Sequence, residues 1–420
     1  MKPDRLRLRY MTEVRSKAEP GGLSGDVTFL PMEAVGDRGG FDGNDVRPRN
    51  EIGTGYSYFE DGDVVRAKVT PCFENGKGAV MRGLAGGRGF GSTELLAMRP
   101  RPGINARFLY YVLMSHEFVS RGVGSLYGAH GVKRVPEKLF RDFVAWSPSE
   151  LTQRAIADYL DREVSRIDAV IVQRQRLADL DRERFEATRR SLVAGTPDGG
   201  VARPVALTWT RQLASHWPLR RLRQVARLES GHTPSRQHPE YWVDCQVPWV
   251  SLSDVGGFRD EQIDEILETA EAVSELGLAN SSARLLPEGT VILSRTASVG
   301  FACVLGRPMA TTQDFANWVC GPHLRPRYLL HVLRAMTSEF EKLRYGSTHQ
   351  TIYMPDIKRL EVPLPSLSEQ DAIIRAVGNL AGEHRHLQEL VRRQVAVLQE
   401  RRHALITAAV TGQLDIVEAA

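Results

Sequence analysis

The chain has 420 residues, with 55 lysines and arginines against 51 aspartates and glutamates, which gives a formal net charge of +4. A typical domain has about 150 residues, so this length predicts two or three domains. The hydrophobic share of 42% is enough for sizeable cores and excludes global disorder. The small net charge also argues against a protein that holds its partners by bulk positive charge alone.

The four cysteines, Cys72, Cys245, Cys303 and Cys320, lack the CxxC spacing of zinc sites. Neither a metal site nor a disulfide framework is expected, and these residues are predicted to be buried as small hydrophobic side chains. The N-terminus has no apolar segment, and no run approaches about 18 uninterrupted apolar residues. We expect a soluble, cytoplasmic protein that has no membrane partner.

Residues 1–147 are typical of a globular α+β domain. Short runs rich in β-branched residues alternate with glycine and aspartate turns, and one amphipathic stretch, Arg107–Leu113, predicts a helix. Strands and helix in this mixture indicate an α+β fold.

A long helix is predicted next, over residues 148–195. It begins at the break Pro148-Ser149, ends at Gly195 and contains no internal proline. At about 1.5 Å rise per residue, it would be roughly 65 Å long. Its apolar residues recur at heptad spacing, which is typical of a helix that buries a stripe against a partner helix.

The partner helix is found by comparing the chain with itself. Residues 365–412 align with residues 148–195 without a gap, at a constant offset of 217 residues. We expect the two helices to pack on each other, and the order of the segments favours an antiparallel pair. Four polar residues fall on the predicted seam: Arg174, Asp181, His384 and Arg401.

The segments around the helices correspond as well, although more loosely. Gly289–Arg295 aligns with Gly62–Lys68, so the second globular segment repeats the first. The predicted segments are a first domain, a helix, a Pro/Gly-rich linker, a second domain, a second helix and a tail, at residues 1–147, 148–195, 196–218, 219–364, 365–413 and 414–420. The predicted fold class is α+β, with two pseudo-symmetric mixed domains separated by a pair of long, antiparallel coiled-coil helices.

No catalytic motif is found in the sequence. Asn75–Gly78 lacks the flanking residues of a Walker phosphate loop, and Gly86–Gly91 lacks the last glycine of a dinucleotide loop. His384 and His386 are two positions apart on a helix and face different directions, so they do not predict a metal site. A stand-alone nuclease or methyltransferase would need a carboxylate cluster or a cofactor loop, and neither is seen.

Two stretches of the second domain resemble a known family. Leu228–Ser235, followed by His238–Trp242, resembles the opening of a target-recognition domain, and Tyr345–Pro355 resembles its close. Together with the duplicated helices and the chain length, they resemble the specificity subunit of type I restriction-modification systems. The first domain departs from this pattern, because Ser16–Pro20 is only a weak echo of Ser230–Pro234.

The resemblance implies a non-catalytic DNA-binding subunit. Such a subunit binds a bipartite double-stranded DNA target with one half-site per target-recognition domain, and its helices form the platform for two methyltransferase (modification) subunits. Restriction/translocase subunits complete the complex. The partners would supply adenine-N6 methylation and ATP-dependent cleavage, so S-adenosylmethionine, ATP and Mg are expected on them and no cofactor is expected in this chain.

Residues in polar, glycine-rich loops are the candidates for DNA contact, because their side chains can reach base edges or phosphates. Arg295 offers a guanine fork and Gln350 an adenine clamp. The candidates of the second domain are Ser230, His232, Thr233, Ser235, Arg295, Thr348, His349 and Gln350. Those of the first domain are Arg66, Lys68, His130, Lys133 and Arg134. Because the second domain is near neutral, we predict weak or no DNA binding by the isolated chain.

Two other functions remain open at this point. The chain could be the recognition adaptor of another defence or modification complex, or a two-headed scaffold whose domains bind proteins. Exposed aromatic anchors would favour the scaffold. Loops rich in Arg, Lys, Gln and Thr around Lys68, Lys133, Arg295 and Gln350 favour DNA.

Overall fold

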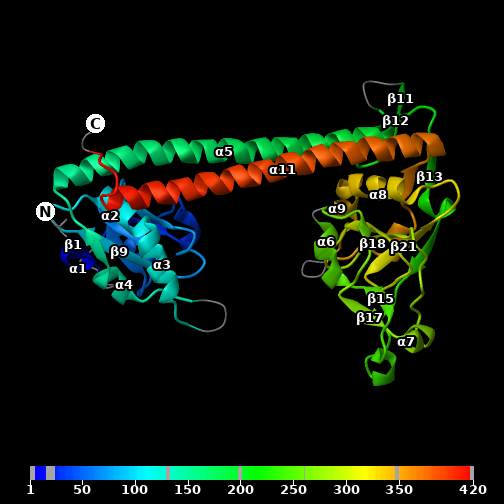
Figure 1. Ribbon diagram of the computed structural model, residues 1–420, viewed down its shortest axis with the longest axis horizontal. Coiled ribbons are helices and arrows are strands. Elements are labelled where there is room, and N and C mark those ends of the chain that lie inside the picture. Colours follow the sequence, from blue (N-terminus) through cyan, green and yellow to red (C-terminus); the bar gives the residue numbers. More distant parts are fainter. Residues whose placement is uncertain are drawn as a thin grey trace. The chain divides into compact units, whose positions relative to one another are not determined.

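The computed structural model divides the chain into two compact units (Figure 1). The first unit combines residues 1–176 with residues 391–420, and the second comprises residues 177–390. The residues described are 5–15, 24–128, 133–196, 201–259, 261–345 and 350–416.

The first unit contains two four-stranded sheets. The antiparallel sheet has the order β2-β9-β6-β7, with strands β2 (Thr12–Val14), β9 (Leu95–Pro100), β6 (Val64–Ala67) and β7 (Gly78–Val80). The other sheet has the order β4-β3-β8-β5, with strands β4 (Val46–Pro48), β3 (Asp26–Leu30), β8 (Arg88–Gly91) and β5 (Ser57–Glu60). A separate pair, β1 (Arg5–Arg7) and β10 (Val144–Trp146), joins the start of the domain to its end.

The described part of the first domain also contains four short α-helices: α1 (Leu8–Met11), α2 (Ala106–Met114), α3 (His116–Gly124) and α4 (Glu137–Asp142). Helix α2 confirms the helix predicted from the sequence. It begins at Asn105, whose side chain accepts the backbone N–H groups of Arg107 and Phe108 and so caps the free helix end. The apolar run Phe108–Met114 is buried, and this burial holds α2 against β6 and β7.

The second unit has the same kinds of element. Its larger sheet has the order β14-β21-β18-β19-β16, with strands β14 (Ala226–Ser230), β21 (Phe315–Cys320), β18 (Val291–Ser294), β19 (Ala302–Leu305) and β16 (Glu265–Ile266). The smaller sheet has the order β17-β15-β20, with strands β17 (Glu271–Val273), β15 (Val247–Val250) and β20 (Ala310–Thr311). The closing pair consists of β13 (Leu219–Arg221) and β22 (Glu361–Pro363). The short helices are α6 (Val255–Arg259), α7 (Glu275–Ala279), α8 (Pro326–Ala335), α9 (Thr337–Leu343) and α10 (Met354–Ile357).

The two domains share one topology. The order β2-β9-β6-β7 of the first domain is repeated as β14-β21-β18-β19 in the second. The order β4-β3-β8 is repeated as β17-β15-β20, and in each case the last two strands pair in parallel. Helices α2, α3 and α4 and strand β10 then follow in the first domain in the same order as α8, α9, α10 and β22 in the second. The internal duplication therefore extends through the first domain, although its opening motif is a weak match in sequence.

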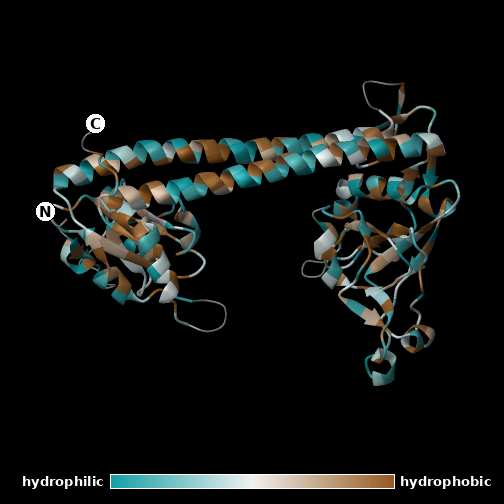
Figure 2. Cartoon of the chain, viewed as in Figure 1, coloured by the Kyte–Doolittle hydropathy of each residue, from teal (hydrophilic) through white to brown (hydrophobic). Residues whose placement is uncertain are grey.

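The two long helices are α5 (Glu150–Ala194) and α11 (Leu367–Val410), as the repeat predicted. Each ends at a glycine in the left-handed region, Gly195 with φ 67° and Gly412 with φ 75°, where a side chain would be strained. Figure 2 shows hydrophilic and hydrophobic residues alternating along both helices. Each long helix is divided between the two compact units, at residues 176/177 in α5 and at residues 390/391 in α11. The limits of the units therefore lie within the helices, whereas the predicted domain limits lie at the helix starts.

Within each unit the long helices pack on each other and run antiparallel. In the second unit the His384 Nδ1 lies 2.5 Å from the Asp181 carboxylate, and the Gln388 side chain donates to the Ala178 carbonyl at 2.9 Å. In the first unit the Arg402 Nε lies 3.1 Å from the Asp168 carboxylate. Polar residues on the seam are thus paired with each other, which favours one register over others.

Two of the four polar residues predicted on the seam lie outside it. Arg174 and Arg401 are exposed, whereas Asp181 and His384 meet in the seam as predicted. The heptad count shifts along a helix of this length, because 3.6 residues per turn does not divide seven evenly. Among the described residues, no helix is long and apolar enough to cross a membrane.

The segment predicted as a linker is folded instead. Strands β11 (Ala202–Pro204) and β12 (Gln212–Ala214) form an antiparallel ribbon there. Trp209, Leu213 and Trp217 from this segment are buried in the core of the second unit. Burial of two tryptophans outweighs the breaking effect of the nearby prolines and glycines.

Candidate nucleic-acid interface

In the second unit, three loops are held together by main-chain hydrogen bonds. The amide of Arg295, just after β18, donates to the Asp314 carbonyl at 2.8 Å, and the Arg295 carbonyl accepts the amide of Ile352 at 2.8 Å. The amide of Ala297 donates to the Gln350 carbonyl at 2.8 Å. We call residues 295–297, 312–314 and 350–352 the second three-loop frame.

The first unit contains the same arrangement. The Lys68 amide donates to the Glu94 carbonyl at 2.9 Å, and the Lys68 carbonyl accepts the Val135 amide at 2.7 Å. The Thr70 amide donates to the Lys133 carbonyl at 2.9 Å. Residues 68–70, 92–94 and 133–135 are therefore the first three-loop frame. In both frames a tyrosine pairs with the third loop through two reciprocal backbone bonds, Tyr127 with Arg134 and Tyr345 with Thr351.

This equivalence places four predicted residues at matching positions. Lys68 corresponds to Arg295, and Lys133 corresponds to Gln350, because each pair makes the same main-chain bonds. The correspondence of Lys68 with Arg295 agrees with the alignment of Gly62–Lys68 with Gly289–Arg295. The side chains at matching positions differ between the domains, so the two frames present different chemistry from one backbone arrangement.

Side chains of the second frame converge on Gln313. The Arg295 Nε donates to the Gln313 carbonyl at 3.0 Å, and the Thr233 hydroxyl donates to the Gln313 side-chain oxygen at 2.8 Å. Gln350 accepts a bond from Arg344 at 2.9 Å. Among the residues that the structure describes, Arg295 has no carboxylate within ion-pair distance, so its charge remains available to a ligand.

The segment Ser230–Ser235 lies beside this frame because of one glycine. The Cβ of any other residue at Gly231 would lie 2.1 Å from the Thr312 carbonyl oxygen, so only glycine allows this approach. The His232 amide then donates to the Thr311 carbonyl at 3.0 Å, and the His232 side chain is exposed. Ser230 and Ser235 are exposed too, but the Ser235 hydroxyl accepts the Gln237 amide and caps a turn.

Side chains of the first frame are more engaged with neighbouring acids. The Arg134 guanidinium forms a bidentate ion pair with the Glu94 carboxylate, with N–O distances of 2.7 to 3.0 Å. The Lys68 ammonium lies 3.4 Å from Glu137, and its side chain is only 12% exposed. It lines a cavity of about 460 Å³ together with Arg15 and Arg141. Lys133 is exposed.

Arg66 lies inside the domain, away from any surface that DNA could reach. Its exposed fraction is 0%, and its guanidinium donates to the carbonyls of Phe73 at 2.8 Å and Lys77 at 3.3 Å. The prediction of Arg66 as a DNA contact is therefore corrected by its burial in β6. His130, Thr348 and His349, like the Ser16–Pro20 motif, lie outside the described residues.

Three residues in or beside the frames were not predicted from the sequence: Glu94 and Gln313, which belong to the frames, and Arg344, which donates to Gln350. Gln313 and Glu94 lie in corresponding three-residue loops, after β20 and after β8, but no shared sequence motif marks these loops. The polar run Thr311–Asp314 between two apolar strands was the available signal. Among the described residues, no group of three or more His, Cys, Asp or Glu side chains could hold a metal ion.

Cysteine burial follows the sequence expectation only in part. Cys303 is buried, and burial raises the pKa of its thiol to about 12. Cys72, Cys245 and Cys320 are half-buried. All four are free in the structure.

Comparison with known proteins identifies the class of the second unit. Residues 214–390 match the family described as the type I restriction modification DNA specificity domain. This range contains the whole second three-loop frame and the Ser230–Ser235 segment. The second unit is therefore a DNA specificity domain of the type I class.

Relatives and solved structures extend the likeness. The specificity subunit of the type I restriction enzyme EcoEI from Escherichia coli is 30% identical over 210 residues, 49% of this chain and 34% of that protein. The MjaIX specificity subunit from Methanocaldococcus jannaschii is 26% identical over 164 residues, 39% of this chain and 37% of that protein. The matched region thus spans only about a third of the length of these relatives.

The fold is shared along the whole chain. A chain from a structure titled for complex assembly and conformational transition of the type I R-M system matches with a TM-score of 0.74 and 18% identity, over 98% of both chains. The HsdS subunit from Thermoanaerobacter tengcongensis matches with a TM-score of 0.51 and 19% identity, over 98% of this chain and 97% of that one. The resemblance to type I specificity subunits is therefore confirmed at two levels: residues 214–390 match the domain family, and the whole chain shares the fold of these solved structures.

Proposed function

We propose that the chain binds a bipartite double-stranded DNA target, with one half-site read by each three-loop frame. The observation that carries this proposal is the duplication of the frame, with identical main-chain bonds and different side chains at Lys68 and Arg295, and at Lys133 and Gln350. Two frames of one shape with different side chains suit two half-sites of different sequence. Side chains make the hydrogen bonds to base edges that distinguish one base from another, and the main chain determines the positions of those side chains.

The second frame offers the sharper candidates for base contact. Arg295 has an uncompensated guanidinium, whose fork matches the O6 and N7 acceptors of guanine. Gln350 is held by Arg344 through its side-chain oxygen, so its amide N–H groups point to other acceptors. His232, Thr233, Ser230 and Ser235 lie beside them as contacts to bases or phosphates. In the first frame, Lys68, Lys133 and Arg134 take this role.

The long helices would hold the partners of such a complex. We infer that α5 and α11 bind two methyltransferase subunits, and that restriction/translocase subunits join them. S-adenosylmethionine, ATP and Mg would be bound by those partners, which would carry out methylation and cleavage in the cytoplasm. The chain itself would contribute recognition without catalysis.

A protein-binding scaffold is the second candidate, and exposed aromatic residues support it. Tyr345 and Tyr353 are 52% and 55% exposed, and their rings lie 5.7 Å apart beside the second frame. Exposed aromatic anchors are frequent hot spots of protein interfaces. The same rings could also stack on bases, so only the response to DNA separates the two functions.

The test is to co-express the chain with the adjacent methyltransferase gene and to map N6-methyladenine in the host DNA. We expect an interrupted two-part motif that requires both genes. Arg295→Met should relax one part of the motif, Lys68→Met should relax the other, and Arg307→Met, in an exposed turn, should change neither. A contiguous motif, or a change of both parts by Arg295→Met, would contradict the proposal. A stable complex without any methylated motif would favour an adaptor of another system.

A further inference from the structure

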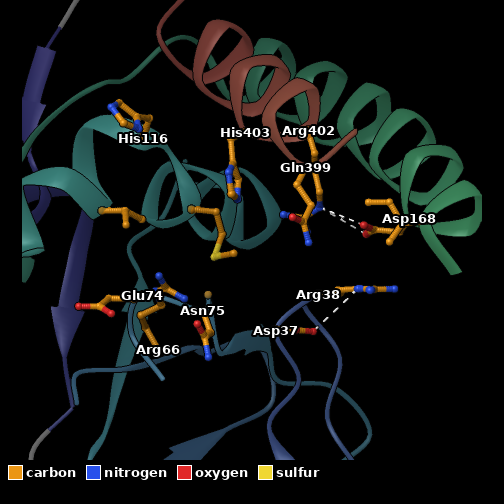
Figure 3. Close-up of a pocket in the computed structure, with 14 residues that line it drawn as sticks. Asp37, Arg38, Arg66, Glu74, Asn75, His116, Asp168, Gln399, Arg402 and His403 are labelled. Atoms are coloured by element: carbon orange, nitrogen blue, oxygen red, sulfur yellow. Dashed lines mark hydrogen bonds and ion pairs between the residues drawn. The ribbon is translucent and has the colours of Figure 1, made fainter. Parts of the chain in front are cut away.

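The first unit contains a cavity of about 310 Å³ that the DNA interface does not use (Figure 3). The segment after β6, the start of α3 and the first-unit parts of the long helices form its walls. Six polar residues among those lining it are Arg38, Arg66, Asn75, His116, Arg402 and His403. Figure 3 shows these side chains arranged around one central space.

Arg66 forms part of this wall and lacks a counter-charge. Two of its N–H groups donate to the carbonyls of Phe73 and Lys77, and its guanidinium lies 4.9 Å from the Phe73 ring centroid. Its Nε has no hydrogen-bond partner. Among the residues that the structure describes, no carboxylate lies within ion-pair distance of Arg66. A buried charge is normally paired, because its removal from water is unfavourable.

Arg66 differs in this respect from the other buried arginines. Within the described residues, four arginines are buried: Arg66 at 0%, Arg189 at 4%, Arg334 at 7% and Arg402 at 6% exposure. Arg189 pairs with Glu261, Arg334 with Asp264 at 2.5 Å, and Arg402 with Asp168 at 3.1 Å. The Nε of Arg189 and of Arg334 also lacks a partner, so the missing carboxylate, and not the free Nε, sets Arg66 apart.

The acidic residues around the cavity do not supply the counter-charge that Arg66 lacks. Asp168 faces Arg402, and Asp37 lies 3.9 Å from Arg38. Glu74 also lines the cavity, and its carboxylate lies beyond ion-pair distance from Arg66. Burial, followed by the charges of Arg402 and His116, lowers the pKa of His403 in the same wall.

We propose that this cavity binds a small phosphate-type oxyanion, such as inorganic phosphate or the phosphate of a mononucleotide, which supplies the negative charge that Arg66 lacks. Asn75 and Gln399 provide neutral amide donors in the same wall. Phosphate binding through arginine and amide groups follows their ordinary preference.

The experiment measures the melting temperature of the full chain in sodium phosphate and in sodium chloride at equal ionic strength. A ligand that binds only the native state raises the melting temperature, and the rise grows with ligand concentration. We expect a rise in phosphate that saturates and that is absent in chloride. Deoxyadenosine monophosphate should give the same response.

Asn75→Asp is the decisive variant, because it places a carboxylate in the wall near Arg66. It should raise the melting temperature without phosphate and abolish the response to phosphate. Asn50→Asp makes the same charge change on an exposed residue outside the cavity and should keep the wild-type response. Arg66→Met should also lose the response, but Asn75→Asp decides the matter if Arg66→Met does not fold.

Three results would overturn the proposal: equal melting temperatures in phosphate and chloride, an unchanged phosphate response of Asn75→Asp, or loss of the response in Asn50→Asp. In those cases the role of Arg66 is only structural, through its hydrogen bonds to the carbonyls of Phe73 and Lys77. A duplex oligonucleotide added with phosphate separates the sources of the anion. The response should persist, whereas its loss would assign the phosphate to the DNA backbone.

Discussion

Arg134 and Glu94 form a forked ion pair in the first three-loop frame, in which the Arg134 Nε and Nη2 donate to both carboxylate oxygens of Glu94 at 2.7 to 3.0 Å. The pair joins the second loop of the frame to the third. It also occupies the arginine that would otherwise be the strongest fork for a guanine in this domain.

Glu94→Gln should therefore free Arg134 for DNA. The single amide oxygen of glutamine would replace the two charged carboxylate oxygens of Glu94. Arg134 could then bind phosphates or guanines at more than one sequence, which lowers the specificity of this half-site. We expect methylation of sites with a mismatch in one half-site only, corresponding to a loss of about 1–3 kcal/mol of discrimination. Sequencing of N6-methyladenine in cells that carry the complex measures this change. Glu33→Gln, on an exposed residue of the same domain, should leave the motif intact; a change in both half-sites would contradict the assignment of one frame to one half-site.

The starts of the two long helices differ in their N-terminal caps. The Ser366 hydroxyl accepts the Glu369 amide, and the Glu369 carboxylate accepts the Ser366 amide at 2.8 Å, which forms a capping box. In α5 the Ser149 hydroxyl accepts the Thr152 amide at 3.2 Å, but Thr152 makes no return bond to the Ser149 amide. Thr152→Glu should complete the box and raise the free energy of unfolding by about 0.5–1 kcal/mol. Urea denaturation measures the change, with Thr152→Val as the matched control that should not stabilise. If Thr152→Glu has no effect, the cap is already satisfied by other groups.

His331 makes the stability of the second unit depend on pH. Burial and the positive charge of Arg334 lower the pKa of His331 to about 4. Its other charged neighbours are Asp264, Arg189 and Glu261. The folded state keeps His331 neutral, whereas the unfolded chain binds a proton below about pH 6.5. The unfolded state thus gains protons first as the pH falls, and stability is lost between about pH 6.5 and pH 4.

His331→Leu should remove this part of the pH dependence. Melting curves at intervals from pH 7 to pH 4 should fall less steeply for the variant than for the wild-type chain. His323→Leu, on an exposed residue of the same unit, should keep the wild-type slope. Parallel curves for His331→Leu and wild type would show that another group titrates in this range.

Paired deletions test whether the long helices set the distance between half-sites. Removal of residues 170–176 and 391–397 deletes one heptad from each helix and keeps the pairs Asp168–Arg402 and Asp181–His384. A helix would shorten by about 10 Å, which is about three base pairs at about 3.4 Å each. We expect the gap in the methylated motif to shrink by about this amount. Deletion of residues 170–176 alone cannot satisfy both polar pairs and should destabilise the chain; an unchanged gap in the paired deletion would refute the helices as the spacer.

The long helices could be predicted because their signals are local and repeated. The Pro-Ser breaks, Gly195, Gly412 and the constant offset are all visible in the printed sequence, and the structure places the helix ends within a few residues of them. The topology of the first domain could not be predicted in the same way. Loops such as that between β6 and β7 differ in length from their counterparts, so the two domains lose linear alignment while they keep the same strand order.

Which polar residues are buried could not be predicted from the sequence either. Arg66 and Lys68 are two positions apart and equally basic, yet Arg66 is inside β6 and Lys68 begins a loop. A polar residue within an apolar run carries no signal of whether it reaches solvent. The tryptophans at 209 and 217 show the reverse case, since they lie in a Pro/Gly-rich segment but belong to a core.

In the proposed function, the three-loop frames separate the main-chain geometry from the side chains that would contact the bases. Their bonds join main-chain amides and carbonyls, so the geometry does not depend on which side chains stand at positions 68, 133, 295 and 350. A change of side chain at these positions therefore puts little of the fold at risk. If the frames contact DNA as proposed, a few point substitutions would change the recognised sequence, and the two half-sites could be changed independently of each other.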